Sequence, residues 1–158
     1  MQGMSGFTRE AVCAGRFPVL LRGAFIASLI LIAVEAMAAD YTWDIAPGAV
    51  GPGNGVIDDG SGAWDTTSGN WTADGGANNV AWPDNTNDIA VFSGGQGGSV
   101  AVSGSFSAGG ISFTGTAANS YSFYGSGGPT LTLGVRGVTV GNGAGAITFD
   151  ETLNLGLS

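Results

Sequence analysis

The sequence predicts an all-β fold, a right-handed parallel β-helix, and three observations support this prediction. Short segments carry large apolar residues at positions i and i+2 around a small or polar residue, glycine-rich turns separate these segments, and no window beyond the first forty residues shows sustained helical periodicity. The eight segments are Ile89–Phe92, Val100–Val102, Ile111–Phe113, Tyr121–Phe123, Leu131–Leu133, Val138–Val140, Ile147–Phe149 and Leu153–Leu155.

Alternation of this kind is typical of strands that bury one face, because neighbouring side chains on an extended chain point to opposite sides. Successive segments begin about 6 to 11 residues apart, with glycine pairs such as Gly94-Gly95 and Gly109-Gly110 between them. We expect turns at these pairs, since glycine tolerates the positive φ of a tight turn. Three-residue strands joined by glycine corners favour a β-helix, whereas sandwich strands are commonly longer. A β-sandwich is the alternative.

Residues 1–38 have the three-part pattern of a signal peptide. A basic start is followed by an apolar run over residues 23–34 and by small residues at Ala36, Ala38 and Ala39. The run is about a dozen residues long, well short of the roughly 20 that a membrane-spanning helix needs. We therefore predict export, with cleavage after Ala38 or Ala39. The basic residues are Arg9, Arg16 and Arg22.

The chain after this leader is strongly acidic. It keeps one cation, Arg136, against ten carboxylates, which is a formal charge of −9. Nucleic-acid binding is excluded as a function class, because affinity for phosphates depends on Lys and Arg. Cys13, the only cysteine, lies in the leader, so disulfides and thiolate metal sites are not expected.

Residues 39–88 differ from the alternating region that follows, since they hold all four tryptophans and few aliphatic residues. We interpret this stretch as an aromatic-rich N-terminal cap, in which indole rings close the open end of the first coil. The alternative is a platform of exposed rings on which sugars stack. The residues are Trp43, Trp64, Trp71 and Trp82.

Catalytic chemistry has few candidates in this sequence. Histidine and lysine are absent, which removes Ser-His and Cys-His nucleophile systems and Schiff-base chemistry. Asp58-Asp59, and Asp84 with Asp88, are the carboxylate pairs that would act on a glycoside, but their Gly, Asn and Pro surroundings favour turns. Calcium ligands at 58–62 or 85–88 match no known loop pattern. We expect no enzyme activity, no cofactor and no metal site.

Four motifs occur in a distinctive order: Gly62-Ala63-Trp64-Asp65, Gly69-Asn70-Trp71, Trp82-Pro83 and Asn87-Asp88-Ile89-Ala90-Val91-Phe92. This order resembles the N-terminal unit of proteins with autotransporter-associated β-strand repeats. The resemblance implies a signal peptide, a Gly-rich β-helical passenger and, further along, a C-terminal outer-membrane barrel. No segment of these 158 residues corresponds to that barrel, so the resemblance implies membrane attachment only through a part outside this chain.

The resemblance also implies a function and a location. We expect a non-catalytic passenger segment that serves as a stalk or adhesin, at the cell surface or outer membrane of a Gram-negative bacterium or outside the cell. Host or neighbouring-cell surface glycans or proteins are the expected partners. A carbohydrate-binding β-sandwich module with exposed tryptophans is the alternative function. Residues 89–158 are predicted to be a truncated repeat region, because the alternation runs to the last residues without a polar cap.

Overall fold

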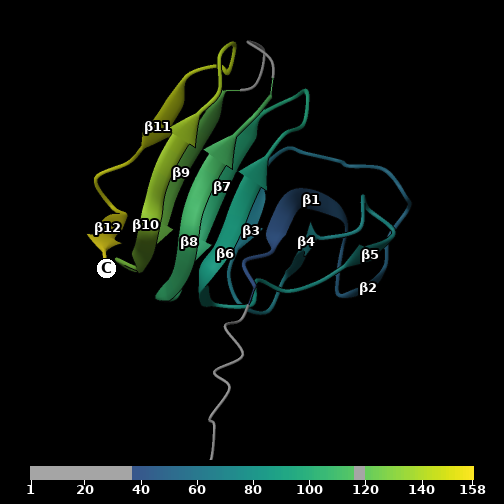
Figure 1. Cartoon of the computed structure of the whole chain (residues 1–158), viewed down its shortest axis with the longest axis horizontal. Helices are drawn as coiled ribbons and strands as arrows, with labels where there is room; N and C mark the ends of the chain where they lie inside the picture. The colour runs from purple at the N-terminus through teal and green to yellow at the C-terminus, as the bar shows by residue number, and fades with distance from the viewer. Residues whose placement is uncertain (1–36, 116–119) are drawn as a thin grey trace, which may run out of the picture. The chain divides into compact units, whose positions relative to one another are not determined.

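A computed structural model describes residues 37–115 and 120–158, which form an all-β structure of twelve strands (Figure 1). The larger sheet contains β1 (Asp40–Gly48), β4 (Gly69–Thr72), β6 (Asn85–Phe92), β8 (Phe106–Phe113), β10 (Thr130–Val140) and β12 (Asn154–Leu157). The second sheet contains β3 (Gly62–Trp64), β7 (Gly98–Ser103), β9 (Tyr121–Ser126) and β11 (Ile147–Phe149). A short pair joins β2 (Gly51–Pro52) to β5 (Asn78–Asn79).

The path of the chain alternates between the two main sheets. From β6 onward, the chain crosses to the other sheet after each strand. Each strand therefore pairs in parallel with the strand two positions further along the chain, in the same sheet. The first strands also pair in parallel, but over more positions: β1 pairs with β6 and β3 pairs with β7. Parallel strands need a crossover connection, and here the crossover is itself a strand of the opposite sheet. This pairing differs from the antiparallel sheets of immunoglobulin-type sandwiches.

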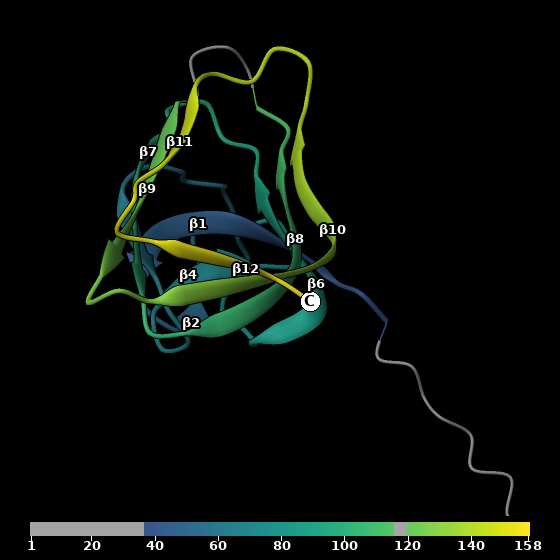
Figure 2. The same ribbon diagram turned by 90° about the vertical axis from the view of Figure 1, so that its left-hand side faces the viewer.

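The larger sheet bends at a corner, so the strands enclose the core on three sides (Figure 2). Residues 86–88 of β6 and 134–136 of β10 both lie opposite the single residue Gly109 of β8. A Cβ atom at Gly109 would lie 2.4 Å from the carbonyl oxygen of Asn87, so the close approach of the two backbones requires glycine. The extra residues on either side act as bulges that turn the strands without ending them.

The alternating segments lie in strands, except that Leu153 precedes β12, but two expectations about their limits are wrong. Gly109-Gly110 is not a turn, since both residues lie inside β8. The segments Leu131–Leu133 and Val138–Val140 belong to one strand, β10, which has 11 residues rather than three. Both differences have one cause: the chain turns the corner through bulges within a strand, so a glycine pair here marks close backbone approach instead of a strand end.

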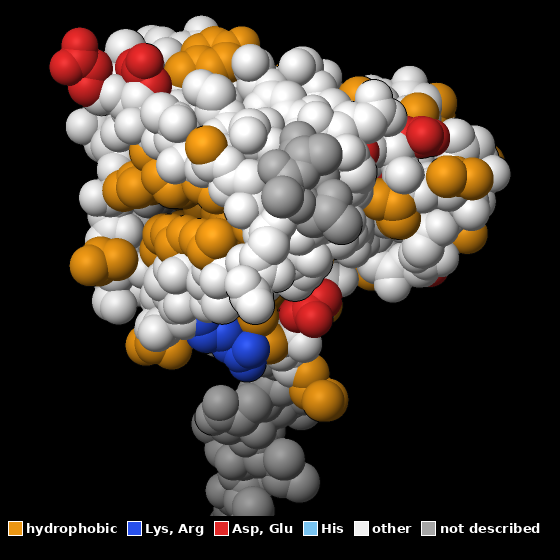
Figure 3. All heavy atoms as spheres, turned by 90° about the horizontal axis from the view of Figure 1, so that it is seen from above, with side chains coloured by type: hydrophobic (Ala, Val, Ile, Leu, Met, Phe, Trp, Pro, Cys, Tyr) orange, Lys and Arg blue, Asp and Glu red, His pale blue; other side chains and the backbone are white. Residues whose placement is uncertain are grey.

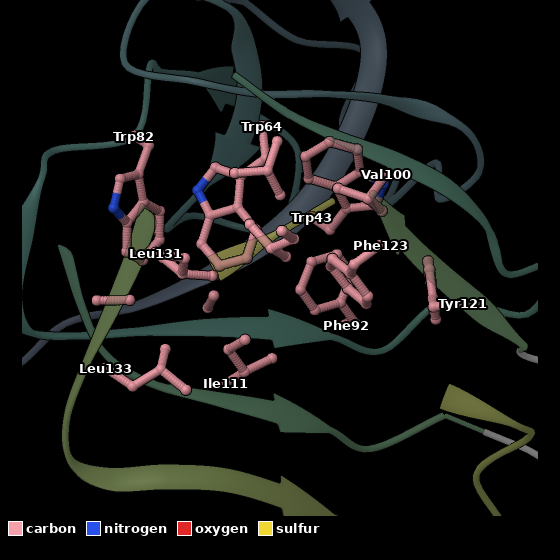
Figure 4. Packing of buried hydrophobic residues seen from close by; sticks show 14 of the residues in the cluster. Trp43, Trp64, Trp82, Phe92, Val100, Ile111, Tyr121, Phe123, Leu131 and Leu133 are labelled. Atoms are coloured by element: carbon pink, nitrogen blue, oxygen red, sulfur yellow. The ribbon is translucent and has the colours of Figure 1, made fainter. Parts of the chain in front are cut away.

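One hydrophobic core lies between the sheets and contains side chains from both (Figure 4). Parallel register places residues of the same kind directly above one another. Phe92 pairs with Phe113 in register and their rings stack at 5.2 Å, and Phe123 stacks in the same way on Phe149 at 5.0 Å. Such offset aromatic pairs contribute about 0.5–1.5 kcal/mol beyond the area that they bury.

The two ends of the stack differ. At the N-terminal end, β4 runs antiparallel along the free edge of β1, and Trp71 of β4 exchanges two backbone hydrogen bonds with Val80. At the other end, β12 is the edge strand, and its Leu155 and Leu157 align with the buried Leu131 and Leu133 of β10. They are 41% and 82% exposed. Hydrophobic side chains accordingly gather on the side that carries β11 and β12 (Figure 3).

Candidate functional site

The four tryptophans form one cluster with the rings in mutual contact. Trp71 of β4 lies at its centre, with ring centroids 4.7 Å from Trp82, 5.0 Å from Trp64 of β3 and 5.1 Å from Trp43 of β1. Trp43 Nε1 donates a hydrogen bond to the carbonyl of Gly60 at 3.0 Å. The Nε1 atoms of Trp64 and Trp71 are buried without a hydrogen-bond partner.

Burial decides what these rings can do. Each of the four indoles is at most 2% exposed, so none presents the open face on which a sugar ring would stack. Trp64 instead contacts Phe106 and Phe123, which belong to the alternating region. The tryptophans are therefore the first layer of a continuous core, next to the strand β4 that covers the edge of β1. The carbohydrate-binding alternative loses its expected ligand-contacting residues.

Asp59 is a buried carboxylate that accepts hydrogen bonds from two distant segments of the chain. Its Oδ2 atom accepts hydrogen bonds from the backbone of Gln96 and Gly97, both at 2.8 Å, and from the Tyr121 hydroxyl at 3.0 Å. Burial raises the pKa of Asp59, but these hydrogen bonds outweigh burial and hold that pKa below its ordinary value. Burial, and then the bond to Asp59, raise the pKa of Tyr121. A carboxylate held in this way links three coils and is not poised to transfer a proton.

The other candidate carboxylates also accept hydrogen bonds from the chain. Asp58 Oδ2 accepts a bond from Asn54 Nδ2 at 2.6 Å, and Asp84 Oδ1 accepts one from the Ser107 backbone at 2.7 Å. Asp84 has a φ of +51°, the left-handed conformation that aspartate tolerates in turns. Asp58 and Asp59 hold different partners, and so do Asp84 and Asp88. Among the described residues, no group of three or more His, Cys, Asp or Glu side chains could hold a metal ion.

Sequence reasoning missed a contact between two residues that it had singled out for different reasons. The Ala39 backbone nitrogen donates to Asp88 Oδ1 at 2.9 Å, and the Ala39 carbonyl accepts from the Ile89 nitrogen at 2.8 Å. Ala36, the first small residue of the predicted cleavage motif, lies outside the described residues, and Ala38 is exposed. No local pattern indicates this contact, because the two partners are 49 residues apart.

The outer face of the larger sheet carries two hollows. One of about 410 Å³ is lined by Asp84 and by hydroxyl side chains that include Ser107 and Thr132. The other, of about 490 Å³, is lined by Ile89, Ser112 and Thr139 beside Arg136, which is exposed. Ser107 pairs in register with Thr132, and Ser112 with Thr139, so short hydroxyl side chains form rows across this face.

Comparison with protein families, with curated proteins and with solved structures found no match to this chain. Within residues 37–115 and 120–158, no helix is long and apolar enough to cross a membrane.

Proposed function

We propose that this chain is a non-catalytic passenger segment of an autotransporter-like protein, exported to the surface of a Gram-negative cell and serving there as a stalk or adhesive surface. Its architecture is a right-handed parallel β-helix with a cap at the N-terminal end. The observation that carries the proposal is the alternating path from β6 onward, in which each strand pairs in parallel with the strand two positions further on. A fold built this way is elongated by adding coils, because each coil contacts only its neighbours.

The two ends of the described stack differ in what they leave exposed. β4 closes the N-terminal edge, whereas Leu155 and Leu157 continue the inward-facing rows of Leu131 and Leu133 and remain exposed. A further coil with the same i and i+2 pattern would bury both leucines and pair with the free edge of β12.

The outer face supports weak and repeated contacts. Serine and threonine rows cross β8 and β10, the formal charge of residues 39–158 is −9, and the large aromatic side chains lie mainly in the core. Single hydroxyl contacts with a surface glycan or protein are weak, but repetition along a fibre multiplies them by raising the effective concentration. Each candidate carboxylate accepts a hydrogen bond from another segment or residue of the chain, which argues against hydrolysis.

Export is the part of this proposal that a cell experiment tests most simply. We would express the full chain with a C-terminal tag in a Gram-negative host and locate it by fractionation. The proposal predicts a protein that has lost its leader and lies outside the cytoplasm. The matched control, Leu29→Arg, places a charge in the apolar run and should leave a full-length protein inside. A wild-type chain that stays full-length in the cytoplasm would contradict the proposal.

A further inference from the structure

Ala39 is the first residue that is tied into the fold by hydrogen bonds among those described. Its nitrogen and its carbonyl oxygen both bond to β6, through Asp88 Oδ1 and the Ile89 nitrogen. Of the described residues before it, Met37 is 90% exposed and Ala38 is exposed, whereas Ala39 is half-buried. The ordered sheet therefore starts at Ala39, one residue before β1.

The two predicted cleavage positions differ in what they would leave behind. A cut after Ala39 would make Asp40 the first residue and would delete both hydrogen bonds to β6. A cut after Ala38 would keep both bonds and would turn the Ala39 amide into a free amine.

We propose that the bond between Ala38 and Ala39 is the processing site, and that Asp88 binds the new α-ammonium group of Ala39. In the reaction, which a signal peptidase catalyses, the oxygen of water bonds to the Ala38 carbonyl carbon and the C–N bond breaks. The Ala39 nitrogen leaves as an amine and takes up a proton at neutral pH, while Ala38 leaves as a carboxylate. The cleavage step depends on the proposed function, because it requires export; the binding step does not.

Electrostatics explains why Asp88 suits this role. Its side chain is only 4% exposed, and burial of a carboxylate is unfavourable unless the charge is paired. In the uncleaved chain the donor at this position is the neutral amide of Ala39. Cleavage places a full positive charge at the same nitrogen, and a charge-assisted hydrogen bond is roughly twice as strong as a neutral one. Removal of the leader thus strengthens the attachment of β1 to β6.

The processing site is tested by the mass of the exported protein and by its N-terminal sequence. We expect a single mature species that begins at Ala39. A first residue of Asp40, or of any residue before Ala39, would overturn the assignment of the site. A chain that is not exported at all would instead contradict the proposed function, and it would leave the following test unaffected.

The ammonium pair is tested in vitro, without export. An enteropeptidase sequence (Asp-Asp-Asp-Asp-Lys) replaces residues 34–38 of the full chain, and cleavage of the purified protein then creates the Ala39 terminus. A matched protein carries the same sequence over residues 33–37 and yields the Ala38 terminus, one residue longer. We expect the Tm of the Ala39 product to be higher by about 3–6 °C. Equal Tm values for the two products would overturn the pairing.

Asp88→Asn assigns this difference to the carboxylate. In that background we expect both products to have the same Tm, because the amide cannot pair with an ammonium charge. A difference that survives Asp88→Asn would contradict the role of Asp88. If Asp88→Asn does not fold, Asp88→Glu keeps the charge on a longer side chain, and the one-residue comparison must still favour the Ala39 product.

Discussion

Strands of residues 40–88 and of residues 89–158 both pair in parallel, but the two regions are stabilised by different contacts. In the second region, aligned apolar residues such as Phe92 and Phe113 stack on one another in successive coils. Backbone hydrogen bonds between the parallel strands hold these coils together. The first region adds an antiparallel strand, four indoles and several aspartate anchors, for example Asp65, which accepts four hydrogen bonds from Thr67 and Ser68. Adding coils to a parallel stack requires only alternating apolar and polar residues. Closing its end requires large side chains and specific polar contacts.

The largest effect should come from the aromatic cluster at the closed end. Trp71→Ala removes a fully buried ring that contacts three other tryptophans and Phe92, so we expect the free energy of unfolding to fall by about 4 kcal/mol. The comparison is Phe149→Ala at the open end, where the ring is only partly buried and contacts mainly Phe123. Urea denaturation measures both. An equal or larger loss for Phe149→Ala would show that the closed end is not special.

Asp59 links the two regions, and its replacement should have the next largest effect. Asp59→Asn removes a charged acceptor from Gln96, Gly97 and Tyr121, and we expect a loss of about 2 kcal/mol at pH 7. Because the folded state holds the pKa of Asp59 below its ordinary value, the stabilisation is present above that ordinary value and disappears as the pH falls through the folded-state pKa.

The pH profile therefore provides the control for Asp59. The difference in the free energy of unfolding between wild type and Asp59→Asn should be constant near neutral pH and should shrink below about pH 4. Denaturant titrations at a series of pH values measure it. A difference that grows on acidification would contradict the direction of the pKa shift.

The corner of the larger sheet should show an effect of similar size. Gly109→Ala places a Cβ atom 2.4 Å from the Asn87 carbonyl oxygen, so the two backbones must separate, and we expect a loss of about 2 kcal/mol. Gly95→Ala is the matched control, since a Cβ there has no atom within 4 Å. Thermal unfolding of the two variants compares them. Equal Tm values would show that the corner tolerates a side chain and that the glycine is not required there.

The smallest effect on stability should come from the open end. Leu157→Ser replaces a side chain that is 82% exposed, so we expect the free energy of unfolding to change by less than about 0.5 kcal/mol. Self-association should nevertheless decrease, because an exposed apolar edge promotes contacts between molecules. Sedimentation at several concentrations measures this. Greater self-association of Leu157→Ser would contradict the interpretation of Leu155 and Leu157 as uncovered core residues.

Alternation in the sequence predicted the all-β class and located the strand segments of residues 89–158, because the period of two reports directly on burial. It did not predict the corner. A glycine pair is compatible both with a turn and with close backbone approach, and only the register of β6 and β10 against Gly109 distinguishes them. Short strands joined by glycine corners were therefore expected where one strand of 11 residues bends.

Residues 40–88 were harder to predict, because their order comes from contacts distant in sequence. The tryptophans were singled out from the sequence, but nothing local indicates that β4 runs antiparallel to β1 while β6 runs parallel to it. The bond between Ala39 and Asp88 is a further example, since it joins a residue of the predicted cleavage motif to a candidate acid across 49 positions. The turn-like surroundings predicted that the aspartates accept hydrogen bonds from backbone nitrogens, but they did not predict which residues supply those nitrogens.

Parallel stacking of neighbouring coils is the central claim, and disulfide formation tests it most directly. Ser112 and Thr139 face each other in register on β8 and β10, at a separation of about 4.8 Å for neighbouring strands, which suits a disulfide. In the protein with Cys13→Ser, the pair Ser112→Cys and Thr139→Cys should oxidise nearly completely under mild conditions, as mass spectrometry of the unreduced protein would show. The pair Ser112→Cys and Thr132→Cys should not, because Thr132 is paired with Ser107. Efficient bonding of the second pair, with none in the first, would contradict the parallel register.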